Sequence, residues 1–276
     1  GAVFSKGGLS KAVTLMNEAK KEVGAENTLT FDLGDVMYDY TTDYIYDSDE
    51  SAIQPIYQAM ASVGYDAITL GNHDFEYTLP YIQKQLNDTG LTDKVVVSNV
   101  KDANTGASIW NENKIIEKTL TKGNGQTMTV KVGIIGETIP KLSKKRCDYT
   151  GVLVGEDIIT NVTKETAALK QQGADVIVVL AHSGVGDEYP TTEMAENVAY
   201  ALTKIDGVDA VLSGHKHAWF CGDGTTKYDS YAGVDPSTGL VNGKNLVMVA
   251  NSGKGIGVVD LKMSNEDGTN RIVGRK

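Results

Sequence analysis

The sequence predicts an α/β fold, and three observations indicate it. Apolar stretches with strand character alternate with amphipathic helical stretches along most of the 276 residues. Four of the apolar stretches end in a polar cluster, which is typical of α/β sheets that bind a ligand beyond their strand ends. The hydrophobic fraction of 41% suffices for a sizeable core, and the longest apolar runs, such as VIVVLA at 176–181, are too short to cross a bilayer.

The first half of the chain alternates helices and strands. Leu9, Val13, Leu15 and Met16 recur at helical spacing, so residues 8–23 are predicted to form a helix. Further helices are expected over 51–64, which ends on a glycine, and over 79–88. Strands are expected between them, at 28–35, 66–74 and 94–100.

The second half begins with a hairpin and then continues the alternation. Residues 113–136 are predicted to form the hairpin, because two strand-like runs flank the turn sequence GNGQ. Helices are expected over 156–173 and 192–205, strands at 174–184 and 208–217, and short strands within 218–263. Two long polar segments, around 40–50 and 222–243, are interpreted as surface loops, with a lid over a site as the alternative.

The charge balance excludes one class of partner. A formal net charge of −10 and a pI near 4.9 repel polyanions, so a nucleic-acid polymer is not expected to bind. An anionic small molecule would need a local positive charge, which a bound metal could supply. The two cysteines, Cys147 and Cys221, are not in a C-x-x-C pattern, which disfavours a thiolate zinc site and leaves their disulfide state open.

All four histidines lie in the polar clusters at strand ends. These clusters are DLGD (32–35), LGNHD (70–74), LAHSG (180–184) and LSGHKH (212–217). Carboxylate, amide oxygen and imidazole together suit divalent Mn, Zn, Fe, Ni or Co. In GHKH, side chains two residues apart on an extended segment face the same way, so both imidazoles are expected to address one site or two neighbouring ions.

These motifs resemble the calcineurin-like metallophosphoesterase superfamily. GD, GNHD, a lone strand-end histidine and GHKH occur in that order. Longer blocks are similar to the 5′-nucleotidase branch, and within it to the bacterial 2′,3′-cyclic-nucleotide 2′-phosphodiesterase/3′-nucleotidases: GYDAITLGNHDFEY, GADVIVVLAHSG, AENVAYALTKIDGVDAVLSGHKH and GIGVVDLKM. The resemblance implies a two-sheet α/β sandwich with helices on both outer faces (αββα).

The resemblance also implies a role for each motif residue. Asp35 would bridge two metal ions, with Asn72, His182 and His215 completing the second-metal site and His217 serving the first. His73 would not bind metal; like Asn72 it would contact the substrate phosphate, and it would either stabilise charge there or protonate the leaving oxygen. Its implied catalytic partner is Glu76, three residues on; Asp74 is the alternative supporting acid.

The chain departs from the family pattern at its beginning and at its end. The Asp-x-His motif of the family's first strand has no counterpart, so residues 1–276 are interpreted as a single catalytic domain that lacks this strand. We therefore expect one well-formed ion site rather than two, and weak activity or none in this form. The family's C-terminal domain, whose aromatic residues hold the nucleobase, is expected to be absent.

The hypothesis that follows is metal-dependent hydrolysis of 2′,3′-cyclic nucleotides, 3′-nucleotides or both. The alternatives are a 5′-nucleotidase or nucleotide-sugar hydrolase, and a non-catalytic module that keeps the fold for binding. By resemblance alone the protein is expected outside the cytoplasm, although no signal peptide is visible in the sequence. The identity of the metal, the nucleotide preferred and the oligomeric state stay open.

Overall fold

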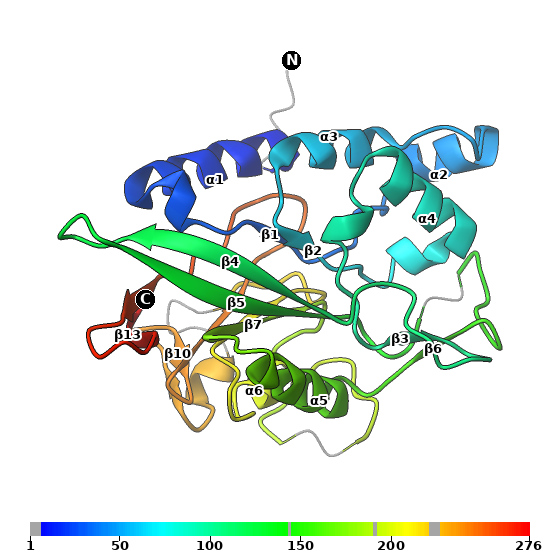
Figure 1. The fold of residues 1–276 in the computed structure, drawn as a ribbon. Helices are drawn as coiled ribbons and strands as arrows, with labels where there is room; N and C mark the ends of the chain where they lie inside the picture. Colours follow the sequence, from blue (N-terminus) through cyan, green and yellow to red (C-terminus); the bar gives the residue numbers. More distant parts are fainter. Residues whose placement is uncertain (1–6, 143–144, 190–191, 221–226) are drawn as a thin grey trace.

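A computed structural model describes residues 7–142, 145–189, 192–220 and 227–276. The chain forms four layers, with two layers of β-structure between two layers of helices (Figure 1). This arrangement confirms the α/β sandwich expected from the sequence.

A seven-stranded mixed sheet forms the larger β layer. Its strand order is β4-β5-β7-β8-β11-β10-β9, with β5, β7, β8 and β11 parallel to one another and the β4–β5 hairpin antiparallel, as predicted. The strands are β4 (Asn113–Thr121), β5 (Thr127–Glu137), β7 (Val176–Ala181), β8 (Ala210–Ser213), β9 (Val234–Asp235), β10 (Leu240–Val241) and β11 (Lys244–Met248).

Three short pairs make up the rest of the β-structure. β1 (Phe31–Asp32) and β2 (Ala67–Ile68) are parallel, β3 (Val100–Asp102) and β6 (Leu153–Gly155) are antiparallel, and β12 (Leu261–Ser264) and β13 (Arg271–Arg275) form a hairpin. An apolar core between the layers joins the large sheet to β1, β2 and the β12–β13 hairpin; it includes Val130, Ile134, Leu180 and, from the smaller elements, Ala67 and Leu261.

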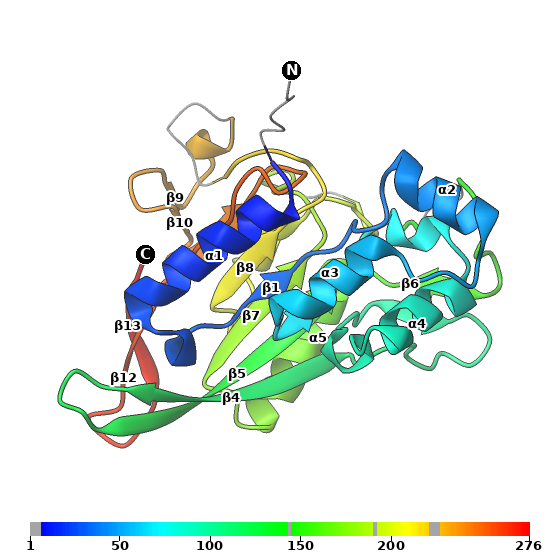
Figure 2. The same cartoon turned by 90° about the horizontal axis from the view of Figure 1, so that it is seen from above.

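Helices cover both outer faces. Four lie on the same side of the large sheet as β1 and β2: α1 (Leu9–Val23), α2 (Tyr40–Ser48), α3 (Pro55–Val63) and α4 (Leu79–Asp88). Figure 2 shows them from above, with α1 and α3 flanking β1. Tyr57 of α3 and Ile82 of α4 are fully buried in the core beneath them. On the opposite face, α5 (Ile158–Gln171) and α6 (Ala199–Leu202) pack on the large sheet. No helix of the described residues is long and apolar enough to cross a bilayer.

Two helices begin later than predicted, each for a local reason. α3 begins at Pro55 because a proline disfavours helical backbone at the residue that precedes it, here Gln54. α6 begins at Ala199 because residues just before it are tied to the end of β7: Gly184 donates its backbone N–H to Asn197 Oδ1 at 3.1 Å, and Val198 donates to Ser183 Oγ at 3.0 Å.

The interpretation of residues 40–50 as a loop is wrong. Asp39 caps this segment by accepting the backbone N–H of Thr42 at 2.7 Å, and α2 follows from Tyr40 to Ser48. The other presumed loop is described only from residue 227, where it forms a short 3-10 turn, Lys227–Ser230, followed by β9 and β10. Cys147 is a free thiol, whereas Cys221 lies outside the described residues.

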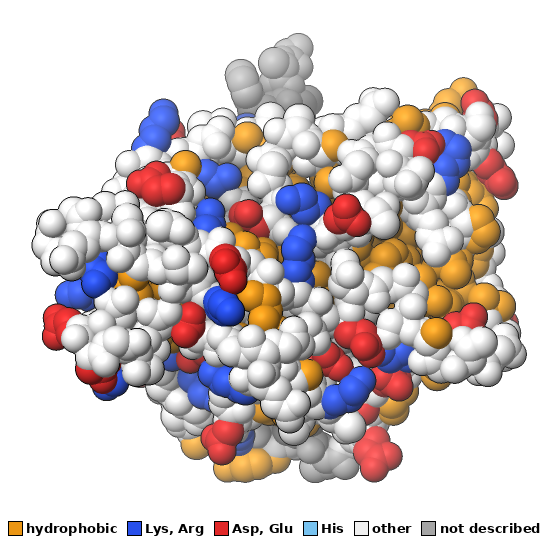
Figure 3. Space-filling model, viewed as in Figure 1, with side chains coloured by type: hydrophobic (Ala, Val, Ile, Leu, Met, Phe, Trp, Pro, Cys, Tyr) orange, Lys and Arg blue, Asp and Glu red, His pale blue; other side chains and the backbone are white. Residues whose placement is uncertain are grey.

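The surface in Figure 3 mixes both signs of charge. Acidic and basic side chains are interspersed over this face, and no continuous basic area is visible on it.

Candidate metal centre

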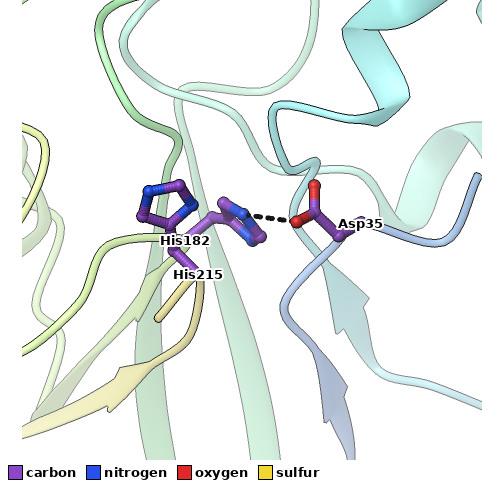
Figure 4. A group of neighbouring side chains, drawn as sticks. All are labelled: Asp35, His182 and His215. Atoms are coloured by element: carbon purple, nitrogen blue, oxygen red, sulfur yellow. Dashed lines mark ion pairs between the residues drawn. The ribbon is translucent and has the colours of Figure 1, made fainter. Parts of the chain in front are cut away.

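Three strand ends bring ligating side chains to one point. Asp35 follows β1, His182 directly follows β7, and His215 follows β8 by one residue. One ligand atom from each lies within 4.8 Å of the others, and the side chains point toward one another in Figure 4. The structure thus brings together three of the residues that the strand-end hypothesis named, although they are up to 180 positions apart in the sequence.

His182 lies at the centre of this group and is almost fully buried. Its Nδ1 lies 2.6 Å from the carbonyl oxygen of Leu33, which sets that nitrogen as the hydrogen-bond donor. Its Nε2 lies 3.1 Å from Asp35 Oδ2 and 3.2 Å from Asn72 Oδ1. Asn72 is therefore a fourth member of the group, and we call Asp35, Asn72, His182 and His215 the acceptor cluster.

His215 brings a buried nitrogen that has no hydrogen-bond partner among the residues that the structure describes. Its Nε2 is shielded from solvent, and the nearest charged atom recorded for it is Glu196 Oε2 at 3.7 Å. Burial, together with the nearby His182 and Lys216, lowers the pKa of His215 to about 4. The imidazole is accordingly neutral at physiological pH and has a lone pair to offer.

The pKa of His182 is shifted in the opposite direction to the pKa of His215, because Asp35 lies next to His182. Burial alone would lower the pKa of His182, but the hydrogen bond and charge of Asp35 outweigh it and raise the pKa. Burial alone would raise the pKa of Asp35, but the same contact lowers it. In this structure the two groups form an ion pair, in which a proton on Nε2 separates the facing acceptors.

The donor set fits a divalent cation. Asp35 Oδ2 and Asn72 Oδ1 both face His182 Nε2, which offers a lone pair once its proton is lost, and Nε2 of His215 belongs to the same group. A cation bonded to all of them would replace the shared proton and satisfy each atom. Oxygen and imidazole ligands without thiolate suit Mn, Zn, Fe, Co or Ni.

Asp74 holds the backbone that presents Asp35. Its carboxylate accepts the N–H groups of Asp35 at 2.9 Å, Val36 at 3.1 Å, Met37 at 3.2 Å and Gly71 at 2.8 Å. These bonds stabilise Asp35 in the left-handed region, with φ of 60°. Burial and the charge of Asp35 raise the pKa of Asp74 to about 6, against those hydrogen bonds.

Gly71 is required for the close approach of the two loops. A Cβ at this position would lie 2.2 Å from Asp35 Oδ1 and 2.5 Å from His182 Cε1. No side chain fits there, so the sequence pattern Gly-Asn-His is needed to let Asn72 reach the cluster.

His73 lies beside the cluster and has its own partner. His73 Nδ1 lies 2.7 Å from Glu76 Oε1, and Glu76 Oε2 lies 3.0 Å from Lys145 Nζ. Of the two acids that the sequence left open, Glu76 contacts the imidazole, whereas Asp74 serves the backbone. The ring of Tyr38 packs on His73 with 3.8 Å between centroids. Nε2 of His73 is the nitrogen that remains for another partner.

His217 does not join the acceptor cluster. β8 ends at Ser213, and His215 and His217 have φ of 69° and 52°, so the GHKH segment is a turn. The premise that it is extended, with both imidazoles on one side, is wrong. His217 is exposed, and within the described part of the chain the grouped ligands are Asp35, His182 and His215 alone. Its role as a ligand stays a prediction.

Comparison with known proteins identifies the family. The family model described as calcineurin-like phosphoesterase matches residues 5–219. The chain belongs to the calcineurin-like phosphoesterase family. This result confirms the resemblance inferred from the GNHD and GHKH motifs.

Relatives of this phosphoesterase chain include nucleotide-cleaving enzymes. The trifunctional nucleotide phosphoesterase protein YfkN of Bacillus subtilis (strain 168) is 33% identical over 280 residues, covering 98% of this chain and 18% of YfkN. The 2′,3′-cyclic-nucleotide 2′-phosphodiesterase/3′-nucleotidase of Salmonella typhimurium is 32% identical over 270 residues, covering 95% of this chain and 40% of that protein. The chain thus spans less than half the length of either relative.

A solved structure supports the same fold. The crystal structure of calcineurin-like phosphoesterase YfkN from Bacillus subtilis matches with a TM-score of 0.88 at 32% identity, covering 99% of this chain and 82% of that chain. The agreement over nearly all of this phosphoesterase chain confirms the layered α/β architecture.

Sequence reasoning missed two contributors to the site. The loop-holding role of Asp74 was not foreseen, although its place directly after His73 in GNHD drew attention to it. Lys145 belongs to the basic run KLSKKR at 141–146, a pattern typical of a surface face. Its pairing with a buried glutamate depends on chain folding over 69 positions, which no local pattern reveals.

Proposed function

We propose that this chain is the metal-bearing part of a nucleotide phosphoesterase that hydrolyses 2′,3′-cyclic nucleotides, 3′-nucleotides or both. One observation carries the proposal. Asp35 Oδ2 and Asn72 Oδ1 both face Nε2 of His182, in an arrangement that a cation would satisfy, directly beside an imidazole held by a carboxylate.

Each residue has a separate task in this proposal. One divalent ion would be held by Asp35, Asn72, His182 and His215. A second ion position would take Asp35 and His217 as ligands, which would make the centre dinuclear. Divalent ions bound there supply Lewis acidity toward the phosphoryl group and toward the attacking water. Asn72 and His73 contact the phosphoryl oxygens.

His73 acts as the acid for the leaving oxygen. Because Nδ1 is bonded to Glu76, the proton that it donates is on Nε2. The carboxylate of Glu76 fixes the ring orientation and stabilises the imidazolium, and Lys145 holds the second carboxylate oxygen in place. The proton-transfer group is thereby kept distinct from the ligands.

A substrate panel tests the proposal. The purified chain is supplied with Mn²⁺, Zn²⁺ or Co²⁺ and assayed with 2′,3′-cyclic AMP, 3′-AMP and 5′-AMP, with EDTA as the control. Because one ion site is expected to be well formed, we expect at most weak turnover, restricted to the first two substrates and lost with EDTA. Preference for 5′-AMP would favour the 5′-nucleotidase alternative, and ion binding without any turnover would favour a non-catalytic module.

The proposal extends to a location outside the cytoplasm, which rests on the family resemblance alone. Fractionation of cells that express the full natural gene would test it. Recovery of the protein with cytoplasmic markers would contradict it.

A further inference from the structure

The imidazole of His73 is held from one side by its own turn. His73 directly precedes the 3-10 turn Asp74–Glu76, and side chains three residues apart on such a turn lie one above the other. Glu76 Oε1 accordingly lies 2.7 Å from His73 Nδ1, and the side chain of Glu76 is almost fully buried. This contact fixes the position of one ring nitrogen.

One hydrogen bond does not fix the whole ring. An imidazole attached through Cβ and held at Nδ1 can still pivot about the line between these two atoms, because the terminal torsion of a histidine has broad minima. Such a pivot moves Nε2, the nitrogen that donates the proton in the proposed function. The side chain of His73 is 22% exposed, so solvent on one side leaves room for the motion. A contact on the face of the ring would limit it.

Tyr38 makes that contact. The centroids of the two rings are 3.8 Å apart and their planes are inclined by 37°, so the phenol ring lies across the imidazole and blocks its pivot toward that side. Within the described part of the chain, His73 is the one ring that Tyr38 contacts, and Tyr38 belongs to none of the apolar core clusters. The aromatic ring therefore serves His73 rather than the packing of the core.

The backbone on both sides of Tyr38 is anchored. Met37 is fully buried and donates its N–H to the carboxylate of Asp74 at 3.2 Å. Asp39, on the other side, caps α2 by accepting the N–H of Thr42 at 2.7 Å. Tyr38 is 54% exposed, yet its Cα lies between two fixed residues, so its ring is directed at His73 by the main chain.

We propose that Tyr38 is a positioning residue for His73: the face of its ring limits the pivot of the imidazole and keeps Nε2 directed at the leaving oxygen. The inference rests on the proposed function and deepens it. Tyr38 acts through His73 and not on the substrate itself. The ring carries the effect and the hydroxyl does not, because the contact is between the two rings.

Dependence on the leaving group tests this role. The parent and Tyr38→Leu are loaded with Mn²⁺ and assayed with 3′-AMP and with 4-nitrophenyl phosphate, whose leaving group departs without needing a proton. Tyr38→Leu should lower kcat for 3′-AMP at least about ten-fold, which is less than loss of the acid itself would cost. KM for 3′-AMP and kcat for 4-nitrophenyl phosphate should each change by less than about two-fold. Because ratios are compared, weak turnover suffices.

Two control variants separate the ring from the hydroxyl and from a general change in this segment. Tyr38→Phe keeps the ring and should behave as the parent does. Tyr44→Ala removes a 73% exposed tyrosine of α2 that contacts no other ring among the described residues, and it should also leave both activities unchanged. A loss in Tyr38→Phe as large as that in Tyr38→Leu, or equal losses on both substrates, would overturn the positioning role.

A spectroscopic arm needs neither metal nor turnover. Carbon-13 relaxation of the His73 ring in the metal-free chain measures the pivot, and His73→Asn identifies its signals among those of four histidines. The ring should be well ordered in the parent, Tyr38→Phe and Tyr44→Ala, and mobile in Tyr38→Leu. Unchanged order in Tyr38→Leu would overturn the restraint. If no ester is hydrolysed although the ring becomes mobile in Tyr38→Leu, the proposed function fails and the restraint on the imidazole stands.

Discussion

The acceptor cluster and the His73–Glu76 pair are adjacent in space and sequence, yet their hydrogen bonding differs. In the cluster, Asp35 Oδ2 and Asn72 Oδ1 both face one nitrogen of His182, and within the described part of the chain the Nε2 of His215 has no hydrogen-bond partner. In the pair, both carboxylate oxygens of Glu76 have partners, His73 Nδ1 and Lys145 Nζ.

This difference separates two tasks. In the proposed function a cation would complete the cluster by bonding to its ligand atoms, whereas the carboxylate of Glu76 already has partners on both oxygens and His73 would hold the proton. Asn72, which belongs to the cluster, and His73, which belongs to the pair, are consecutive residues in the sequence.

The largest expected effect comes from removing the centre of the cluster. His182→Ala should weaken Mn²⁺ binding by more than about 100-fold, since even loss of a residue behind a ligand costs 10–100-fold. Turnover of 2′,3′-cyclic AMP should fall to background. Calorimetric titration measures the affinity, and circular dichroism shows whether the variant is folded. Parent-like Mn²⁺ affinity in a folded variant would remove His182 from the ligand set.

His73→Ala should separate the two tasks. Turnover should fall by roughly 10²–10⁴-fold because the acid for the leaving oxygen is lost. Mn²⁺ affinity should change by less than about three-fold, since His73 belongs to the pair. Parallel kinetics and calorimetry on one preparation measure both quantities. Equal losses of turnover and affinity would move His73 into the cluster.

Glu137 tests whether buried oxygens without hydrogen-bond partners are enough to bind an ion when no other ligands lie beside them. It ends β5, is fully buried, and neither carboxylate oxygen has a hydrogen-bond partner, but it belongs to no group of ligands among the described residues. Burial raises its pKa well above the usual value, so its contribution to stability is present at low pH and is lost as pH rises toward the folded-state pKa.

Glu137→Gln should therefore stabilise the protein increasingly above about pH 4.3, the ordinary pKa of a glutamate, by up to about 1.4 kcal/mol per pH unit until the folded-state pKa is reached. Mn²⁺ binding should not change. Urea unfolding at pH 4.5 and pH 7.5 measures the difference. A stabilisation that is the same at both pH values would show that Glu137 is ionised in the folded protein.

The smallest effect is expected at His217. Calorimetry of the parent should show one tightly bound Mn²⁺, because one well-formed site is assembled, and His217→Ala should change its affinity by less than about three-fold. His215→Ala is the matched variant from the same turn and should lose most of the affinity. Two tight ions in the parent would contradict the one-site expectation.

The sequence predicts the alternation of elements and the cluster better than it predicts local backbone. Strand-end polar groups indicated Asp35 and His182. These residues follow β1 and β7, which belong to two different sheets, and the ends of both strands lie at the same site. The same reasoning failed in GHKH, where positive φ angles at both histidines break the two-residue repeat of a strand.

Both local capping and contacts between distant segments limit what the sequence can predict. The helix at Tyr40–Ser48 was interpreted as a loop because of its polar composition, whereas a capping bond from Asp39 defines its start. The partners of Glu76 could be predicted only on one side: His73 lies three residues away, whereas Lys145 approaches from across the fold.

The four backbone bonds to Asp74 have a consequence for how this family is studied by mutagenesis. Replacing Asp74 would release the loop that carries Asp35, so a protein altered there would lose its cofactor without having lost any atom that binds it. A mutational scan that sorts positions by retained metal would count Asp74 among the ligands, although its carboxylate binds only main-chain N–H groups.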